Sequence, residues 1–211
     1  MKQVWRPNRY SLRRNTHYYS GFGENRAYQL MVSPELVNAV GGGDLQQELD
    51  LQALYEEISA DEIRYDPEYW PGLYIRFNDG SPAIMIFRTG KYNIAGADSI
   101  DELINANQKF LSVVRELGLT FDDPDFEIRN LVYLEKYHRE LNLDPIAVEL
   151  GLENTEYEPE QFPGLLYRSP DFIGTFLIFR NGKILLTGSN NPESSIEAFQ
   201  TLFAELDNLF R

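Results

Sequence analysis

Apolar residues recur along the chain with two different periods. Short segments alternate apolar and polar positions, which is typical of strands with one buried face, and longer segments repeat apolar residues every three or four positions, which is typical of amphipathic helices. The longest helical pattern contains Ile100, Leu103, Ile104, Leu111 and Val114. Together these patterns predict a strand, a short helix, three strands separated by turns and a long closing helix, and this order occurs twice.

Turn and cap residues mark the limits of these elements. The first strands are expected around Asn38 and Asn130, and the short helices in LDLQALYEEI and LNLDPIAVELG. The turns contain DPEYWPG or EPEQFPG, then NDGSP or SPDFIG, then RTGK or RNGK, in which Gly90 and Gly182 supply the positive φ of a tight hairpin. The long helices begin with a capping box of Ser99 and Glu102, and with Asn191 as the cap before Pro192.

The chain matches itself at an offset of 92 residues. Residues 65–96 align with residues 157–188 without an insertion, and pairs such as Arg76 with Arg168 and Gly90 with Gly182 are identical. We therefore predict three parts: a basic and aromatic extension over residues 1–30, a first repeat over 31–120 and a second repeat over 123–211. The expected fold is α+β, with an antiparallel sheet that has both long helices on one side.

Alternation within the strands assigns the two faces of this sheet. One set of side chains is expected under the helices: Ile84, Ile86, Ile94, Phe176, Ile178, Ile184 and Leu186. The residues between them point to the other face, which is also apolar although neither repeat has an element left to cover it. This face is either covered, by a second copy or by the extension, or it is the working surface. Three basic pairs in repeat-equivalent positions favour a working surface: Arg76/Arg168, Arg88/Arg180 and Lys91/Lys183.

Composition excludes several classes of protein. The chain has no cysteine and two histidines, so thiol chemistry and histidine-rich metal sites are not expected, and neither is a cofactor or an enzymatic activity. No apolar run is long enough to cross a bilayer, which predicts a soluble intracellular protein without a membrane partner.

The net charge of −14 by itself argues against binding to nucleic acid. Its distribution is uneven: the first thirty residues hold six basic residues and one acid, so the remaining 13 basic and 32 acidic residues carry a net charge of −19. Arginine outnumbers lysine 14 to 5, and this acid-rich, lysine-poor composition suits a halophilic cell, in which salt screens the self-repulsion.

The runs EPEQFPGLLYR and LIFRNGKILLTG closely resemble the signature segments of the TATA-box-binding protein family, and YDPEYWPGLYIR and IMIFRTGK resemble a diverged first copy. The resemblance covers residues 36–211. It implies a saddle of two pseudo-symmetric repeats, with a curved antiparallel sheet, helices on the convex side and a concave side that lies on the DNA minor groove. This family is itself the standard example of such binding and kinking.

The resemblance also implies roles for individual residues, each matched to a position of this sequence. The residues that insert between base pairs are Trp70, Phe87, Phe162 and Phe179. The residues that contact bases and the groove are Asn38, Asn130, Val40, Val132, Met85, Leu177, Leu185 and Thr187. Arg76 and Arg168 contact phosphates, and Glu158 and Glu160 offer acidic groups to a transcription-factor-B-like protein.

Departures from the family pattern gather in the first repeat. Three glycines, at residues 41–43, stand where a β-branched strand is usual, and they should weaken the strand and remove side chains from the groove floor. Asn93 and Ala95 stand where the second repeat has Leu185 and Thr187. Asp98 in the first repeat and Asn190 in the second stand where the family usually has a lysine. We therefore expect the second repeat to contact DNA more extensively than the first.

The leading interpretation is a general transcription initiation factor that binds and bends AT-rich double-stranded promoter DNA, recruits a factor-B-like partner and acts at the nucleoid of an archaeal cell. Two alternatives stay open. One is a specialised paralogue with altered DNA preference, and the other is a protein-interaction module that uses the apolar face. The free protein could also form a homodimer, and the extension could either follow phosphates or lack order.

Overall fold

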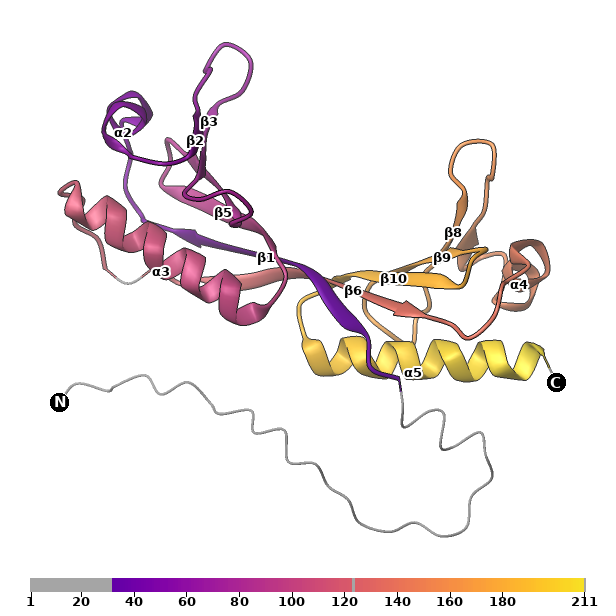
Figure 1. Cartoon of the computed structure of the whole chain (residues 1–211). Coiled ribbons are helices and arrows are strands. Elements are labelled where there is room, and N and C mark those ends of the chain that lie inside the picture. The colour runs from indigo at the N-terminus through magenta and orange to yellow at the C-terminus, as the bar shows by residue number, and fades with distance from the viewer. Residues whose placement is uncertain (1–31, 123, 211) are drawn as a thin grey trace, which may run out of the picture. The chain divides into compact units, whose positions relative to one another are not determined.

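The computed structural model of the chain describes residues 32–122 and 124–210 (Figure 1). The extension predicted over residues 1–30 lies outside the described residues, and its role stays a prediction.

The elements of the two repeats follow the same order. In the first half they are β1 (Glu35–Asp44), α2 (Leu51–Glu57), β2 (Glu62–Arg64), β3 (Gly72–Arg76), β4 (Ala83–Phe87), β5 (Lys91–Ala97) and α3 (Ile100–Glu116). In the second half they are β6 (Glu127–Lys136), α4 (Leu143–Glu149), β7 (Thr155–Glu156), β8 (Gly164–Tyr167), β9 (Thr175–Phe179), β10 (Lys183–Ser189) and α5 (Pro192–Leu209).

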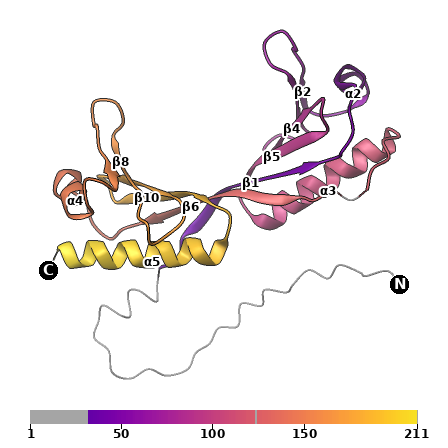
Figure 2. The same cartoon turned by 180° about the vertical axis from the view of Figure 1, so that it is seen from behind.

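All ten of these strands belong to one antiparallel sheet. Their order is β2-β3-β4-β5-β1-β6-β10-β9-β8-β7, so β1 and β6 form the centre and each half of the sheet mirrors the other. Asn38 pairs with Val132 and Val40 pairs with Asn130 across this centre. Figures 1 and 2 show the curved sheet with α3 and α5 on the same side. The predicted α+β class and repeat arrangement are confirmed.

The core lies between the sheet and the helices. The seven side chains that alternation assigned to the helix side are all fully buried. On α3, Leu103, Leu111 and Val114 are buried as predicted, whereas Ile100 and Ile104 are only partly buried. The helix also buries Phe110, and it buries Asn107, whose Oδ1 accepts a hydrogen bond of 2.7 Å from the Tyr92 hydroxyl. A polar residue at a core position escapes a periodicity argument, because only its partner makes its burial favourable.

The helix caps agree with the predictions except in one bond. Asn191 accepts from the Ser194 N–H at 3.0 Å, and Pro192 opens α5. Ser99 accepts from the Glu102 N–H at 3.2 Å, but the Glu102 carboxylate accepts from the Asp98 N–H at 2.8 Å. In a standard capping box the Glu102 carboxylate would accept from the Ser99 N–H, so here its hydrogen bond is shifted by one residue to Asp98.

The strands β2 and β7 were not predicted. They contain three and two residues, which is too short for an alternating pattern, and each is defined by its pairing with β3 or β8 at the edge of the sheet. The hairpin glycines behave as expected: Gly90 has a φ of 86° and Gly182 has a φ of 82°.

Glu205 on α5 generates a test of the packing between helix and sheet. Its side chain is half-buried and accepts a hydrogen bond of 3.1 Å from the Tyr167 hydroxyl. Burial raises the pKa of Glu205 above its usual value, and this hydrogen bond offsets only part of that effect. A carboxyl whose pKa is raised in the folded state favours folding when protonated, so its contribution is lost as the pH rises through the folded-state pKa.

Glu205→Gln should therefore unfold at a higher temperature than the parent chain at pH 7, and the difference should shrink between pH 7 and pH 4, because protonation removes the charge that burial disfavours. Thermal unfolding followed by circular dichroism at the two pH values measures this. Glu197→Gln, an exposed change on the same helix, controls for the loss of one negative charge. An equal effect of Glu205→Gln at both pH values would contradict the prediction.

Candidate nucleic-acid interface

The side of the sheet away from α3 and α5, here called the concave face, is apolar and open. Its strands carry a repeated row of paired residues, which in the second half is Leu134, Leu185, Leu177 and Leu166 and in the first half is Gly42, Asn93, Met85 and Tyr74. Val40, Val132 and Thr187 lie on the same face, and apart from Gly42 all of these residues are partly exposed. No helix or strand of the described residues covers this face. The predicted groove residues are thus brought together on one surface.

Two pairs of aromatic rings stand on this surface, one in each repeat. The centroids of the Trp70 and Phe87 rings are 5.5 Å apart with an interplanar angle of 66°, and those of Phe162 and Phe179 are 5.8 Å apart at 65°. This edge-to-face arrangement is a favourable one for aromatic rings. Trp70 is 41% exposed and Phe162 is 38% exposed, so both pairs present apolar surface to the outside.

A glycine makes room for each aromatic pair. A Cβ atom on Gly72 would lie 2.5 Å from the Trp70 ring, and one on Gly164 would lie 2.7 Å from the Phe162 ring. The rings therefore lie directly over the backbone at the start of β3 and β8. The WPG and FPG sequences of the two repeats contain this signal, although only the structure shows that these glycines serve the rings.

The two predicted base-contacting asparagines are oriented by backbone groups. Asn38 Oδ1 accepts a hydrogen bond of 3.0 Å from the Gly96 N–H, and Asn130 Oδ1 accepts one of 2.7 Å from the Gly188 N–H. Both glycines have positive φ, 95° and 89°. Each amide therefore has its oxygen engaged by a backbone N–H.

The second asparagine has one contact that the first lacks. Asn130 Nδ2 donates to Thr187 Oγ1 at 3.2 Å. The equivalent position in the first repeat is Ala95, which has no hydroxyl. Among the described residues, Asn130 is consequently held by two partners and Asn38 by one.

The two arginines predicted to contact phosphates already have acidic partners. Arg76 Nε lies 3.6 Å from Glu62 Oε2 and donates to the Tyr74 hydroxyl at 3.1 Å. That hydrogen bond is the largest of the effects that raise the pKa of Arg76, and the charge of Glu62 adds a smaller one. Arg168 Nη1 lies 2.7 Å from Glu156 Oε1. The glutamates belong to the short edge strands β2 and β7, which is why the sequence did not reveal them.

The glycines at residues 41–43 do not leave the gap that the sequence suggested. They belong to the continuous ten-residue strand β1, and all three are buried. Neighbouring side chains occupy the space beside them: Phe126 at Gly41, the Tyr92 hydroxyl at Gly43, and Arg129 with Asn93 at Gly42. The glycines thus lie within a complete strand, and side chains from other strands fill the positions that they leave.

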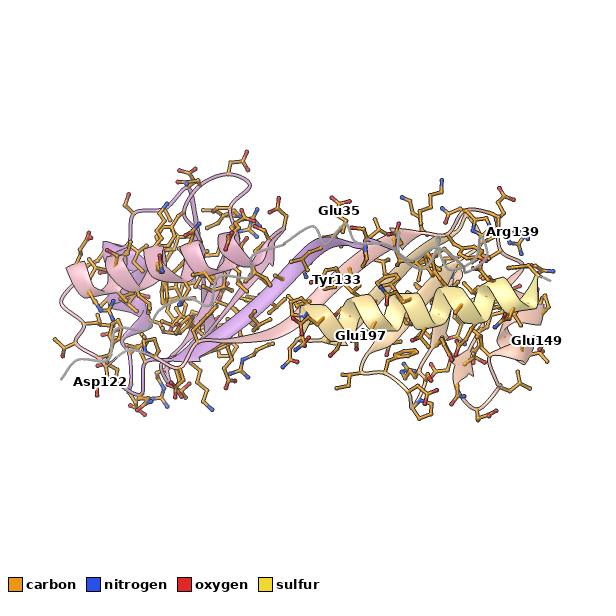
Figure 3. The ribbon with its side chains drawn as sticks, turned by 90° about the horizontal axis from the view of Figure 1, so that it is seen from below. Glu35, Asp122, Tyr133, Arg139, Glu149 and Glu197 are labelled. Atoms are coloured by element: carbon orange, nitrogen blue, oxygen red, sulfur yellow. The ribbon has the colours of Figure 1, made fainter. Side chains whose placement is uncertain are left out.

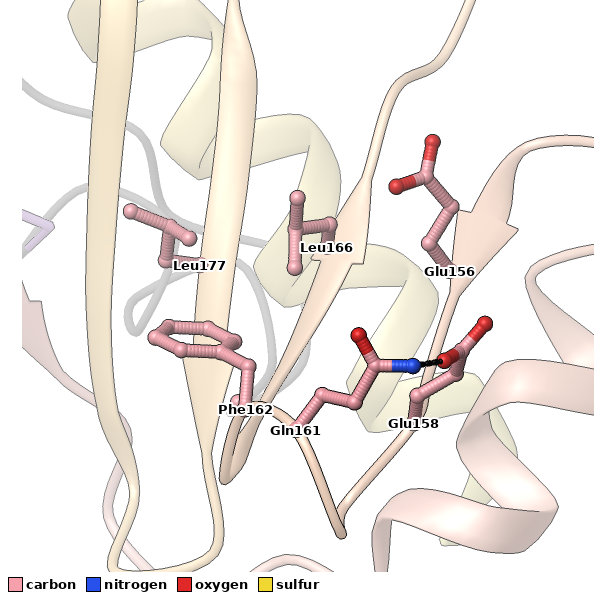
Figure 4. Close-up of a pocket in the computed structure, with 7 residues that line it drawn as sticks. Glu156, Glu158, Gln161, Phe162, Leu166 and Leu177 are labelled. Carbon is pink, nitrogen blue, oxygen red and sulfur yellow. Dashed lines mark hydrogen bonds between the residues drawn. The ribbon is translucent and has the colours of Figure 1, made fainter.

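An acidic pocket adjoins the aromatic pair of the second repeat. Its volume is about 400 Å³, and Figure 4 shows Phe162 and Leu177 on one side and Glu156 and Glu158 on the other. Gln161 Nε2 donates to the Glu158 carboxylate across the turn between β7 and β8. Glu158 and Glu160 are both exposed, so the turn presents carboxylates to solvent.

The helix side of the sheet is strongly acidic. Figure 3 looks onto it, with the exposed residues Asp122, Glu149 and Glu197 spread along its length. Within the described residues, no three histidine, aspartate or glutamate side chains gather into a metal site, and no helix is both long and apolar enough to cross a membrane.

The chain matches the family model described as transcription factor TFIID, or TATA-binding protein, over residues 33–117 and again over residues 125–209. The chain belongs to the TATA-binding protein family. It is 38% identical to TATA-box-binding protein C of Halobacterium salinarum, covering 84% of this chain and 99% of that protein. It is 35% identical to the TATA-box-binding protein of Archaeoglobus fulgidus, covering 83% and 95%.

A solved structure, that of Methanococcus jannaschii TBP, is similar to this fold with a TM-score of 0.73 and 34% sequence identity over 83% of this chain and 99% of that one. The predicted family and saddle fold are therefore confirmed. TATA-binding proteins are DNA-binding transcription factors and not enzymes. Several relatives come from halophilic archaea such as Halobacterium and Haloarcula, in agreement with the acidic composition.

Proposed function

We propose that this TATA-binding protein acts in transcription initiation by placing its concave face on the minor groove of AT-rich promoter DNA, bending the duplex and recruiting a transcription-factor-B-like protein. The observation that carries the proposal is the presence of an exposed aromatic pair in each half of an uncovered apolar sheet face. The site of action would be the nucleoid.

The aromatic pairs supply the mechanism for bending. Separating two stacked base pairs costs a few kcal/mol per step, and a flat ring that enters the gap restores part of the lost contact. Trp70 and Phe162 are suited to this because they are exposed and because the glycines beneath them keep the rings on the surface. A bent duplex then meets more of the apolar face, which adds burial worth about 25 cal/mol per Å².

The central asparagines supply the preference for A·T pairs. The minor-groove edge of an A·T pair presents acceptors only, whereas a G·C pair adds the guanine amino donor. Since Gly96 and Gly188 engage the asparagine oxygens, the groups left for the groove are donors. Donors facing acceptors favour A·T pairs at the centre of the site.

The exposed turn between β7 and β8 is the proposed docking site for the partner. Glu158 and Glu160 are exposed and present two carboxylates on this turn. Such a turn would suit a basic segment of the partner. Because the turn lies next to the aromatic pair, the partner would meet both protein and bent DNA.

The first prediction concerns the wedge. Phe162→Ala combined with Phe179→Ala should abolish DNA bending and leave the fold intact, because the rings contribute surface on the concave face and not core. Energy transfer between dyes at the ends of an AT-rich duplex measures the bend. Tyr55→Ala, which removes a ring that is also 38% exposed but lies on α2, is the matched control.

Two outcomes would contradict this prediction. Bending that is unchanged in the double variant would remove the wedge mechanism. A fall of the unfolding temperature by well over about 10 °C, equivalent to several kcal/mol, would show that the rings belong to the core.

The second prediction concerns the unequal halves. Asn130→Ala and Phe179→Ala should weaken binding to one AT-rich duplex more than Asn38→Ala and Phe87→Ala do, because the second half has a complete leucine row and a doubly held asparagine. Titrations of the four variants at fixed salt measure the difference. Equal losses within each pair would rule out the asymmetry.

The third prediction concerns salt. Arg76 and Arg168, the arginines proposed to contact phosphates, are already paired with Glu62 and Glu156, so binding a phosphate exchanges one ion pair for another. Affinity should therefore fall much less between 50 and 200 mM salt than the roughly 10³- to 10⁵-fold loss of a protein with six to ten phosphate contacts.

The carboxylates themselves provide the control for the salt prediction. Glu62→Gln with Glu156→Gln should strengthen binding at low salt and steepen the salt dependence, since both arginines are then released for phosphates. A steep salt dependence in the parent chain, or no change in the double variant, would contradict this account.

A further inference from the structure

The concave faces of the two repeats differ most at one place. In the second half, Leu134 and Leu185 are direct neighbours on β6 and β10, and in the first half the equivalent neighbours on β1 and β5 are Gly42 and Asn93. Two adjacent leucines of the groove floor are thus replaced by a residue without a side chain and by an amide.

The space over Gly42 is occupied by polar groups. A Cβ atom there would lie 2.7 Å from Arg129 Nε and 2.7 Å from Asn93 Oδ1. Asn93 pairs with Gly42 and therefore shares its face, and the 2.7 Å approach places Arg129 Nε on that face too. Arg129 is exposed, and neither side chain has a hydrogen bond or ion pair to another described residue. The first half therefore presents an unengaged acceptor beside an unengaged cation, here called the polar subsite.

The chemistry of this subsite is complementary to a G·C pair. A G·C pair presents the guanine N2 amino group as a donor, flanked by the acceptors guanine N3 and cytosine O2. The Asn93 carbonyl oxygen can accept from that amino group, and the Arg129 guanidinium can donate to a flanking acceptor with the added strength of its charge. The leucines of the second half would leave the amino donor without a partner, which is costly in a dry interface.

We propose that the polar subsite of Asn93, Gly42 and Arg129 accepts a G·C base pair under the first repeat, so that the protein reads an asymmetric site with one A·T-only half and one half that tolerates G·C. This inference rests on the proposed function, because it assumes that the concave face lies on the minor groove. It assigns to the first repeat a specificity of its own.

The test uses the pseudo-symmetry of the saddle. The full chain is titrated with an all-A·T duplex, with duplexes in which each base pair in turn is replaced by G·C, and with duplexes that carry G·C at symmetry-related positions of both halves. A protein with one tolerant half can bind the duplex in either of two orientations, and it will favour the one in which a single G·C pair lies under the first repeat. At the tolerant position, a single replacement should therefore keep affinity within about twofold, whereas the symmetric double replacement should cost at least about fivefold.

Two variants assign this pattern to the subsite. Asn93→Leu, which installs the second-repeat residue, should bind the all-A·T duplex but lose at least about fivefold on the single G·C duplex. Leu185→Asn should restore affinity for the duplex that carries G·C at symmetry-related positions of both halves. Asn105→Leu, an exposed change on α3, is the matched control and should keep the parent pattern.

The outcomes separate this inference from the proposed function. If the all-A·T duplex is bound and bent but every single G·C pair costs as much as in Asn93→Leu, the polar subsite has no role and only this inference fails. The inference also fails if Asn93→Leu retains the parent pattern. If the parent chain neither binds nor bends the all-A·T duplex, the proposed function fails and the inference fails with it.

Discussion

The antiparallel pairing of β1 with β6 is the interaction on which the rest of the structure depends. It joins the inner strand of each repeat, with Asn38 opposite Val132 and Val40 opposite Asn130, and so turns two five-stranded halves into one sheet. Because α3 and α5 cover the same side of this sheet, the other side remains open along both halves. The pairing also places the two asparagines beside the centre, where they form the middle of the proposed groove contact.

The open face has to remain apolar in water without joining other copies. Its row of four leucines in the second half and its aromatic pairs favour association, while the net charge of −19 outside the first thirty residues opposes it. The same charge repels phosphates. Arg76 and Arg168 lie beside glutamates, and the proposed binding to DNA therefore depends on shape, burial and hydrogen bonds more than on counterion release.

The two halves keep one backbone and differ in side chains. Both repeats keep the glycine N–H group that donates to Asn38 or Asn130, and both keep the glycine beneath Trp70 or Phe162. These glycines set the geometry of the concave face. The floor between them has changed from leucines to Gly42 and Asn93 in the first repeat only. The same backbone fold can therefore carry two different sets of side chains on the proposed DNA-binding face.

The sequence alone determined the repeat, the order of the long elements, the two faces of the sheet and the family, because these depend on period, register and motif. The tertiary structure decided what depends on neighbours from distant strands. Asn107 is buried because Tyr92 donates to it, and β2 and β7 are strands only because β3 and β8 lie beside them. Arg129 reaches the space over Gly42 from another strand, and that contact has no counterpart in any local pattern because its cause is the pairing of β1 with β6.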